Sequence, residues 1–129
     1  MDNFPEELRY SSEHEWVRVL DGIVRVGVTH YATGALGDIV YVSLPTVGNE
    51  VVAGDTCGEL ESTKSVSDLF CPVTGVVVQV NETASESPEL INESPYDEGW
   101  LFEVEVSADA DFDDLLDAAG YAELIASLD

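Results

Sequence analysis

Several segments of this chain alternate between hydrophobic and polar residues with a period of two, a pattern typical of half-buried β-strands. Val24, Val26 and Val28 alternate in this way, and the turn around Asp21 before them predicts a hairpin. Short strands joined by tight turns predict a flattened barrel or sandwich, a mainly β fold of the α+β class. Strands are expected at residues 13–19, 22–28, 38–44, 51–52, 58–61, 66–71, 75–81 and 100–106.

Three regions depart from the strand pattern. Residues 29–36 predict a short helix in the N-terminal half, and residues 83–99 predict a loop or short irregular helix. Near the C-terminus, apolar residues at helical spacing predict an amphipathic helix over 112–119, which Gly120 breaks, and a second helical piece over 121–128.

Two finer predictions concern single positions. Thr29 has a side chain suited to the N-cap of the first helix, and Gly37 suits its end. In the strand at 100–106, alternation predicts that one set of side chains faces the core and the other faces outward. The inward set is Phe102, Val104 and Val106, and the outward set is Leu101, Glu103 and Glu105.

The length of 129 residues fits a single domain. We expect this domain to span residues 1–129, with its core over about 8–106 and a C-terminal helical segment over about 111–128.

The charge of the chain is unusual, because 27 acidic residues stand against four basic ones, for a net charge of −23. Such a chain repels the phosphates of nucleic acids and the surface of anionic membranes, so neither is expected as a partner. No apolar run is long enough for a membrane span, and the N-terminus lacks the features of a signal peptide. We therefore expect a cytoplasmic protein. Its Cys and His residues show no spacing typical of a metal site.

Lys64 is the only lysine in the chain, and it stands between two predicted strands at 58–61 and 66–71. The small polar residues around it (Ser62, Thr63, Ser65) suit a tight turn, so we expect a primary amine at the tip of a hairpin. An exposed lysine is mostly protonated at neutral pH and is a poor nucleophile by itself. An isolated surface charge is the simpler interpretation, but another enzyme could acylate an amine placed in this way.

The segment Glu61–Asp68, which reads Glu-Ser-Thr-Lys-Ser-Val-Ser-Asp, resembles the lipoyl-lysine motif of the glycine cleavage system H proteins. Further matches follow in the order and spacing of that family, and together they cover roughly residues 8 to 124. They include His14–Trp16, Leu36–Val40, Leu44–Gly48, Gly54-Asp55, Pro72–Gly75, Val80–Glu82, Pro88–Asn92 and Pro95–Trp100.

The resemblance implies a fold of the biotinyl/lipoyl-carrier type and a covalent lipoate in amide linkage to Lys64. It implies a non-catalytic carrier, expected to be monomeric, that receives an aminomethyl group from glycine decarboxylase (P protein). The carrier would deliver this group to an aminomethyltransferase (T protein) and electrons to dihydrolipoamide dehydrogenase (L protein). A lipoate ligase or an octanoyl transferase would begin the modification of the lysine.

The same resemblance implies which residues contact the arm. It places the contacts near His14 and Glu15 and at Asp68, where a carboxylate could hold the cationic amine of the loaded arm. Glu61 is expected to belong to the surface that the lipoylating enzyme reads, or to pair across the hairpin. Trp16 is expected to pack in the core.

Some positions depart from the pattern of the family. His30 replaces an acid, Thr63 replaces a branched aliphatic residue, and Cys71 replaces a small residue. Cys57 and Cys71 each lie seven residues from Lys64 and would face each other if the turn were centred on it. We expect two small buried side chains there rather than a stable disulfide.

Other functions remain open at this point. A relay protein that passes lipoyl groups to other enzymes would need the same lysine. A lipoyl domain of a 2-oxo acid dehydrogenase would carry Asp-Lys-Ala, and a biotin carrier would carry Met on both sides of the lysine; this chain has Thr63 and Ser65 there. A small binding protein that kept the fold but lost the modification is a further alternative.

Overall fold

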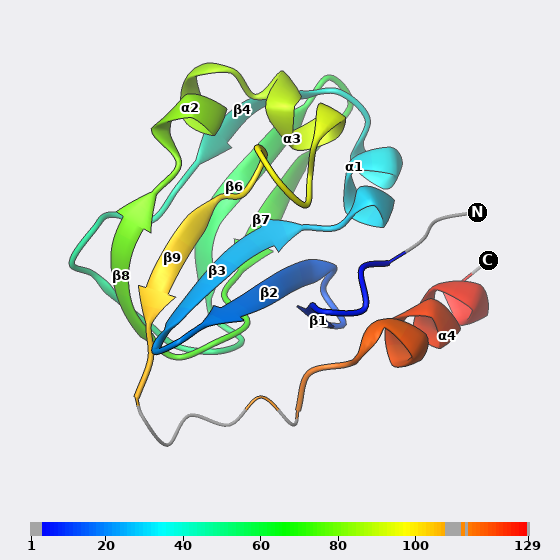
Figure 1. Cartoon of the computed structure of the whole chain (residues 1–129). Helices are drawn as coiled ribbons and strands as arrows, with labels where there is room; N and C mark the ends of the chain where they lie inside the picture. The colour runs from blue at the N-terminus through cyan, green and yellow to red at the C-terminus, as the bar shows by residue number, and fades with distance from the viewer. Residues whose placement is uncertain (1–3, 108–111, 113, 129) are drawn as a thin grey trace.

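A computed structural model describes residues 4–107, 112 and 114–128, and within these ranges the strands form two antiparallel sheets (Figure 1). The larger sheet has the order β1-β2-β3-β9-β8-β5, and the smaller has the order β4-β6-β7. The strands are β1 (Arg9–Tyr10), β2 (Glu15–Leu20), β3 (Ile23–Val28), β4 (Ile39–Ser43), β5 (Glu50–Val51), β6 (Thr56–Ser62), β7 (Val66–Phe70), β8 (Gly75–Val80) and β9 (Phe102–Glu105). The helices are α1 (His30–Leu36), α2 (Glu82–Glu86), α3 (Glu89–Glu93) and α4 (Ala118–Leu128).

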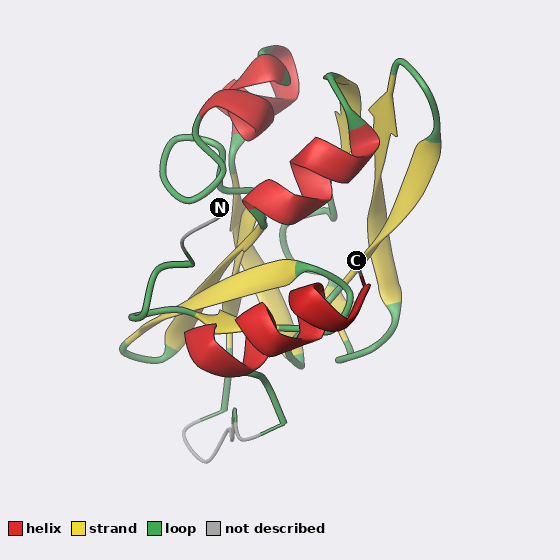
Figure 2. Ribbon diagram, turned by 90° about the vertical axis from the view of Figure 1, so that its right-hand side faces the viewer, coloured by secondary structure: helices red, strands yellow, loops and turns green. Residues whose placement is uncertain are grey.

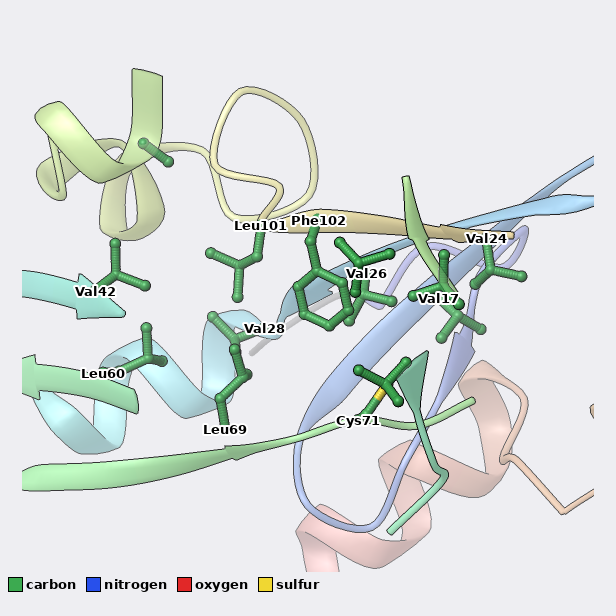
Figure 3. Packing of buried hydrophobic residues seen from close by; sticks show 14 of the residues in the cluster. Val17, Val24, Val26, Val28, Val42, Leu60, Leu69, Cys71, Leu101 and Phe102 are labelled. Atoms are coloured by element: carbon green, nitrogen blue, oxygen red, sulfur yellow. The ribbon is translucent and has the colours of Figure 1, made fainter. Parts of the chain in front are cut away.

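The core lies between the two sheets. Figure 3 shows Val26 and Phe102 of the large sheet and Leu60 and Leu69 of the small sheet within one packed cluster. All four side chains are at most 2% exposed. Apolar residues that alternate along the strands of both sheets therefore meet in one layer, and the sandwich form of the predicted fold is confirmed.

A second, smaller cluster lies on the opposite face of the large sheet, where α4 packs beside β1 and β2 (Figure 2). The Tyr10 and Tyr121 rings stack with their centroids 4.8 Å apart. Trp16 is fully buried and its indole N–H donates to the Pro95 carbonyl over 2.9 Å, so the prediction that it packs in the core is confirmed.

Several local predictions are also confirmed. The first hairpin forms from β2 and β3 around the turn at Asp21 and Gly22. Thr29 is the N-cap of α1, and its hydroxyl accepts from the Ala32 N–H over 3.2 Å. Gly37 follows α1 with φ +88°, a conformation that costs glycine little and other residues much.

The predicted helix over 112–119 is wrong. Leu116 instead forms a β-bridge to Tyr10, with N–H···O distances of 2.8 and 2.7 Å. The helix begins at Ala118 and passes through Gly120, because the Asp117 carboxylate accepts from the Gly120 N–H over 2.8 Å and caps its first turn. Residue 113 of this predicted helix, and residue 111 at the start of the predicted C-terminal segment, lie outside the described residues.

The prediction that Leu101 faces outward is also wrong, because its side chain is fully buried in the core cluster. β9 begins only at Phe102, so the alternation of the strand does not extend to Leu101. Glu103 does leave the core, yet it is only 7% exposed because Arg25 covers it. The Arg25 Nε donates to Glu103 over 2.9 Å, and its guanidinium lies 4.5 Å from the Trp100 ring centroid.

None of the helices within the described ranges combines the length and the apolar character that crossing a membrane requires.

Candidate functional site

Lys64 stands at the tip of the hairpin formed by β6 and β7, and its side chain is exposed. The Ser62 N–H donates to the Ser65 carbonyl over 2.8 Å. The Ser62 hydroxyl accepts from the backbone N–H groups of Lys64 and Ser65 over 3.1 and 3.0 Å. One serine therefore satisfies both donors of the turn, which fixes the backbone that carries the lysine.

A second set of hydrogen bonds ties this turn to the rest of the protein. The Thr63 N–H donates to the Asp38 carbonyl over 3.2 Å. The side chain of Asn92, at the end of α3, accepts from the Ile39 N–H over 2.8 Å and donates to the Gly37 carbonyl over 2.9 Å. The sequence assigns Asn92 no role beyond its place in the family pattern. Its only signal is a side-chain amide, which can donate and accept a hydrogen bond at once.

We predict that Asn92→Ala lowers the free energy of unfolding by about 1–3 kcal/mol, because it leaves the Ile39 N–H and the Gly37 carbonyl without their partner. Urea unfolding measures this loss. Glu93→Ala, an exposed change one residue along the same helix, is the matched control and should change the free energy by less than about 0.5 kcal/mol. Equal effects of the two substitutions would contradict the role assigned to Asn92.

The Lys64 side chain runs close to Gly37. A Cβ built at Gly37 would lie 2.9 Å from Lys64 Cε, so a larger residue there would displace the flexible end of the lysine side chain. The ion pairs between described residues are Arg18–Glu7 and Arg25–Glu103, and neither involves Lys64. The amine is therefore available to a visiting enzyme.

Glu15 points into the protein and is 2% exposed. Its carboxyl accepts from the Ser11 hydroxyl over 2.6 Å and from the Phe70 N–H over 3.3 Å. Burial raises the pKa of Glu15 to about 8, and the two hydrogen bonds only partly offset this rise. The carboxyl lines a cavity of about 310 Å³ together with Phe70 and Cys71.

Asp68 is exposed and lies opposite Glu59 in the small sheet. It lines a second cavity, of about 520 Å³, together with Glu50, Asp55 and Glu59. Glu15 and Asp68 thus line two different cavities, and the structure does not bring the two predicted arm contacts together in one pocket of its described part.

His14 is held by the C-terminal helix. Its Nδ1 lies 2.7 Å from the Tyr121 hydroxyl, which lies 2.8 Å from the Thr29 hydroxyl. The His14 backbone has φ +73°, an uncommon value for a residue with a side chain. Burial lowers the pKa of His14, which favours the neutral ring. The ring therefore contacts α4 rather than the hairpin tip.

Glu61 is half-buried on the outer face of the small sheet. Its strand partners are Tyr41 on β4 and Val66 on β7, so it stands between these two side chains. Glu61 is close in sequence to Lys64 and lies on the small sheet, whereas Glu15 lies on β2 of the large sheet.

Cys57 and Cys71 are both free thiols, and the bulge between Thr56 and Gly58 alters their register. The Cys71 N–H donates to the Asp55 carbonyl over 2.9 Å, so Cys71 is not directly opposite Cys57. Their side chains still interact, and this interaction together with burial raises the pKa of Cys57. The Cys71 thiol is 1% exposed and donates to the Val73 carbonyl over 3.0 Å.

No cluster of three or more His, Cys, Asp or Glu side chains within the described ranges is arranged to hold a metal ion.

Comparison with known proteins gives consistent results over nearly the whole chain. A sequence model of the family described as "Glycine cleavage H-protein" matches residues 8–128. The glycine cleavage system H protein of Staphylococcus haemolyticus is 53% identical over 121 residues, which cover 94% of this chain and 96% of the relative. The protein of the same name from Streptomyces avermitilis is 54% identical over 124 residues, which cover 95% and 98%.

A solved structure agrees with the sequence relatives. The crystal structure of a glycine cleavage system H protein from Mycobacterium marinum superposes with a TM-score of 0.88 at 44% identity, and the match covers 95% of this chain and 99% of that chain. The resemblance found in the sequence is confirmed: the chain belongs to the glycine cleavage H-protein family.

Proposed function

We propose that this chain is the lipoyl-carrying shuttle of the glycine cleavage system, with lipoate attached to Lys64 in amide linkage. The observation that carries the proposal is the exposed amine on a turn fixed by Ser62 and tied to Asp38, in a chain of this family. Lys64 is also the only lysine in the chain, so the attaching enzyme meets no competing side-chain amine.

The residues around the tip fit such a group. Gly37 leaves the path of the lysine side chain clear, and the small side chains of Thr63 and Ser65 flank it. In the attachment step, the deprotonated Lys64 amine attacks the acyl carbon of an activated donor. The C–N bond forms as the bond to the leaving group breaks, and the nitrogen loses its second proton.

When bound, the lipoyl group supplies a dithiol–disulfide couple that can carry an aminomethyl group and then two electrons. The chain itself contributes the tether and catalyses no step. A mobile arm on a fixed hairpin raises the local concentration of its cargo at each enzyme that docks. The proposed partners are glycine decarboxylase, the aminomethyltransferase and dihydrolipoamide dehydrogenase, after a lipoate ligase or octanoyl transferase has modified Lys64.

Two carboxyl groups are proposed to receive the cationic amine of the loaded arm. Asp68 is exposed on β7, the strand that leaves the tip, and Glu15 lines the smaller cavity. Burial holds the pKa of Glu15 high, so a cation that enters this cavity would ionise the carboxyl and release its proton. His14 precedes Glu15, and its contact with Tyr121 supports a positioning role for the backbone that carries Glu15.

Reconstitution tests the proposal. The chain is co-expressed with a lipoate ligase, its modification is checked by intact mass, and it is mixed with the three partner enzymes. We expect glycine-dependent formation of NADH that requires the lipoylated form. Lipoylated protein that gives no NADH with competent partners would indicate the relay function instead, and an unmodified mass would contradict the carrier function itself.

A further inference from the structure

The outer face of the small sheet presents a row of three side chains directly beside the lysine turn. Tyr41, Glu61 and Val66 are paired across β4, β6 and β7, so they lie side by side on one face. Tyr41 is 53% exposed and Val66 is 56% exposed. Two large apolar groups therefore flank a carboxylate on an open surface.

A β-bulge puts Tyr41 on this surface. The register of β4 against β6 shifts between Ile39 and Tyr41, so Val40 is an extra residue. Ile39 and Val42 are both buried, and strict alternation from Ile39 would turn Tyr41 inward and Val42 outward. The bulge instead exposes both Val40, at 52%, and Tyr41. A bulge that turns one aromatic ring towards solvent beside Glu61 points to a contact made by that ring.

The proposed partner enzymes differ in how closely they must approach Lys64, and this difference indicates which of them binds this face. The enzyme that attaches the arm must bring Lys64 Nζ itself into its active site, so it must touch the surface around the hairpin tip. The three enzymes of the shuttle act on the far end of the arm, beyond Lys64 Nζ, so their active sites need not approach the hairpin tip as closely.

The row lies inside the area that the attaching enzyme must cover. Neighbouring strands are about 4.8 Å apart, so Tyr41 lies about 10 Å across the sheet from β7. A specific interface buries about 800 Å² on each partner, which corresponds to a disc of about 16 Å radius. An interface centred on Lys64 therefore includes Tyr41, Glu61 and Val66.

We propose that the row Tyr41–Glu61–Val66 is the docking surface for the enzyme that attaches the lipoyl arm, with Tyr41 as its main anchor. The partner surface would offer an apolar pocket to the Tyr41 ring, an apolar contact to Val66 and a cationic side chain to Glu61. Tyrosine is enriched among residues that dominate binding energy, and the strongly acidic chain attracts a basic partner surface. This inference rests on the proposed function.

The test measures the initial rate of lipoyl attachment by a purified lipoate ligase against the concentration of the chain. Tyr41→Thr, which keeps the preference for strand, should raise KM about tenfold and leave kcat unchanged. Val66→Thr should raise KM about threefold, and Tyr41→Phe should restore nearly the parent value because it keeps the ring. Val19→Thr, on β2 of the other sheet at 48% exposure, is the matched control and should match the parent.

A second measurement tests whether the row binds the attaching enzyme or one of the three shuttle enzymes. Each variant is fully lipoylated with excess ligase and then assayed for glycine-dependent NADH, where all should equal the parent. An unchanged KM for Tyr41→Thr, or an equal rise for Val19→Thr, would overturn the docking surface. Loaded variants that fail in the NADH assay would overturn the choice of occupant. A parent chain that is never lipoylated would contradict the proposed function. That outcome differs from a parent chain that is lipoylated with a KM that the row variants leave unchanged, which would contradict only the docking surface.

Discussion

Lys64→Arg is expected to abolish lipoyl attachment entirely. Arginine keeps the positive charge and the length of the side chain, but its guanidinium stays protonated and does not form the amide under the same conditions. The chain has no other lysine that could replace Lys64. Intact mass after co-expression with a lipoate ligase should show complete modification of the parent and none of the variant.

The variant should otherwise resemble the parent. Lys64 is exposed and takes part in neither of the ion pairs between described residues, so its replacement should change the free energy of unfolding by less than about 0.5 kcal/mol. A stable, folded variant that still gains the mass of a lipoyl group would place the attachment elsewhere. Peptide mapping would then identify the modified residue.

Glu15→Gln is expected to remove a large dependence of stability on pH. The pKa of Glu15 is about 8 in the folded protein, against an ordinary 4.5, mainly because of burial. Between these values the folded state holds a proton that the unfolded state has lost, so stability falls as pH rises. The parent should lose up to about 5 kcal/mol relative to Glu15→Gln over this interval, at up to about 1.4 kcal/mol per pH unit.

Urea unfolding from about pH 4 to about pH 9 measures the difference between parent and variant. Ser11→Ala is a second variant for which the direction of the change in the pH dependence of stability can be predicted. The Ser11 hydroxyl lowers the pKa of Glu15, so its removal should extend the loss of stability to higher pH. A difference between the parent and Glu15→Gln that does not change with pH would contradict the buried, protonated carboxyl.

Local chemistry explains which parts of the fold the sequence could predict. The small residues around Lys64, the cap at Thr29 and the glycine after α1 act within a few residues, and each was predicted correctly. The predicted helix over 112–119 failed because Leu116 pairs with Tyr10, a residue distant in sequence whose position no local pattern contains. The prediction that Leu101 faces outward was wrong for a similar reason, since the pairing of β9 with β3 determines where β9 starts.

The candidate site shows the same limit. Sequence indicated Glu15 and Asp68 as acids near the arm, but the face to which each points depends on tertiary packing, and the two line different cavities. The contact between His14 and Tyr121 joins residues more than a hundred positions apart. The bulge at Val40 exposes Tyr41 against the alternation that a strand pattern assumes, so the sequence pattern assigns that ring no role.

The environment of the two native cysteines has a practical consequence for thiol titration of the reduced carrier. Cys71 is inaccessible in the folded chain, and the raised pKa of the half-buried Cys57 leaves little reactive thiolate at neutral pH. If Lys64 carries the proposed lipoyl arm, a thiol-specific dye applied to the folded, reduced protein should therefore read out the two sulfurs of the arm against a low background. The same dye added in denaturant counts two further thiols, which gives each sample an internal standard for its degree of loading.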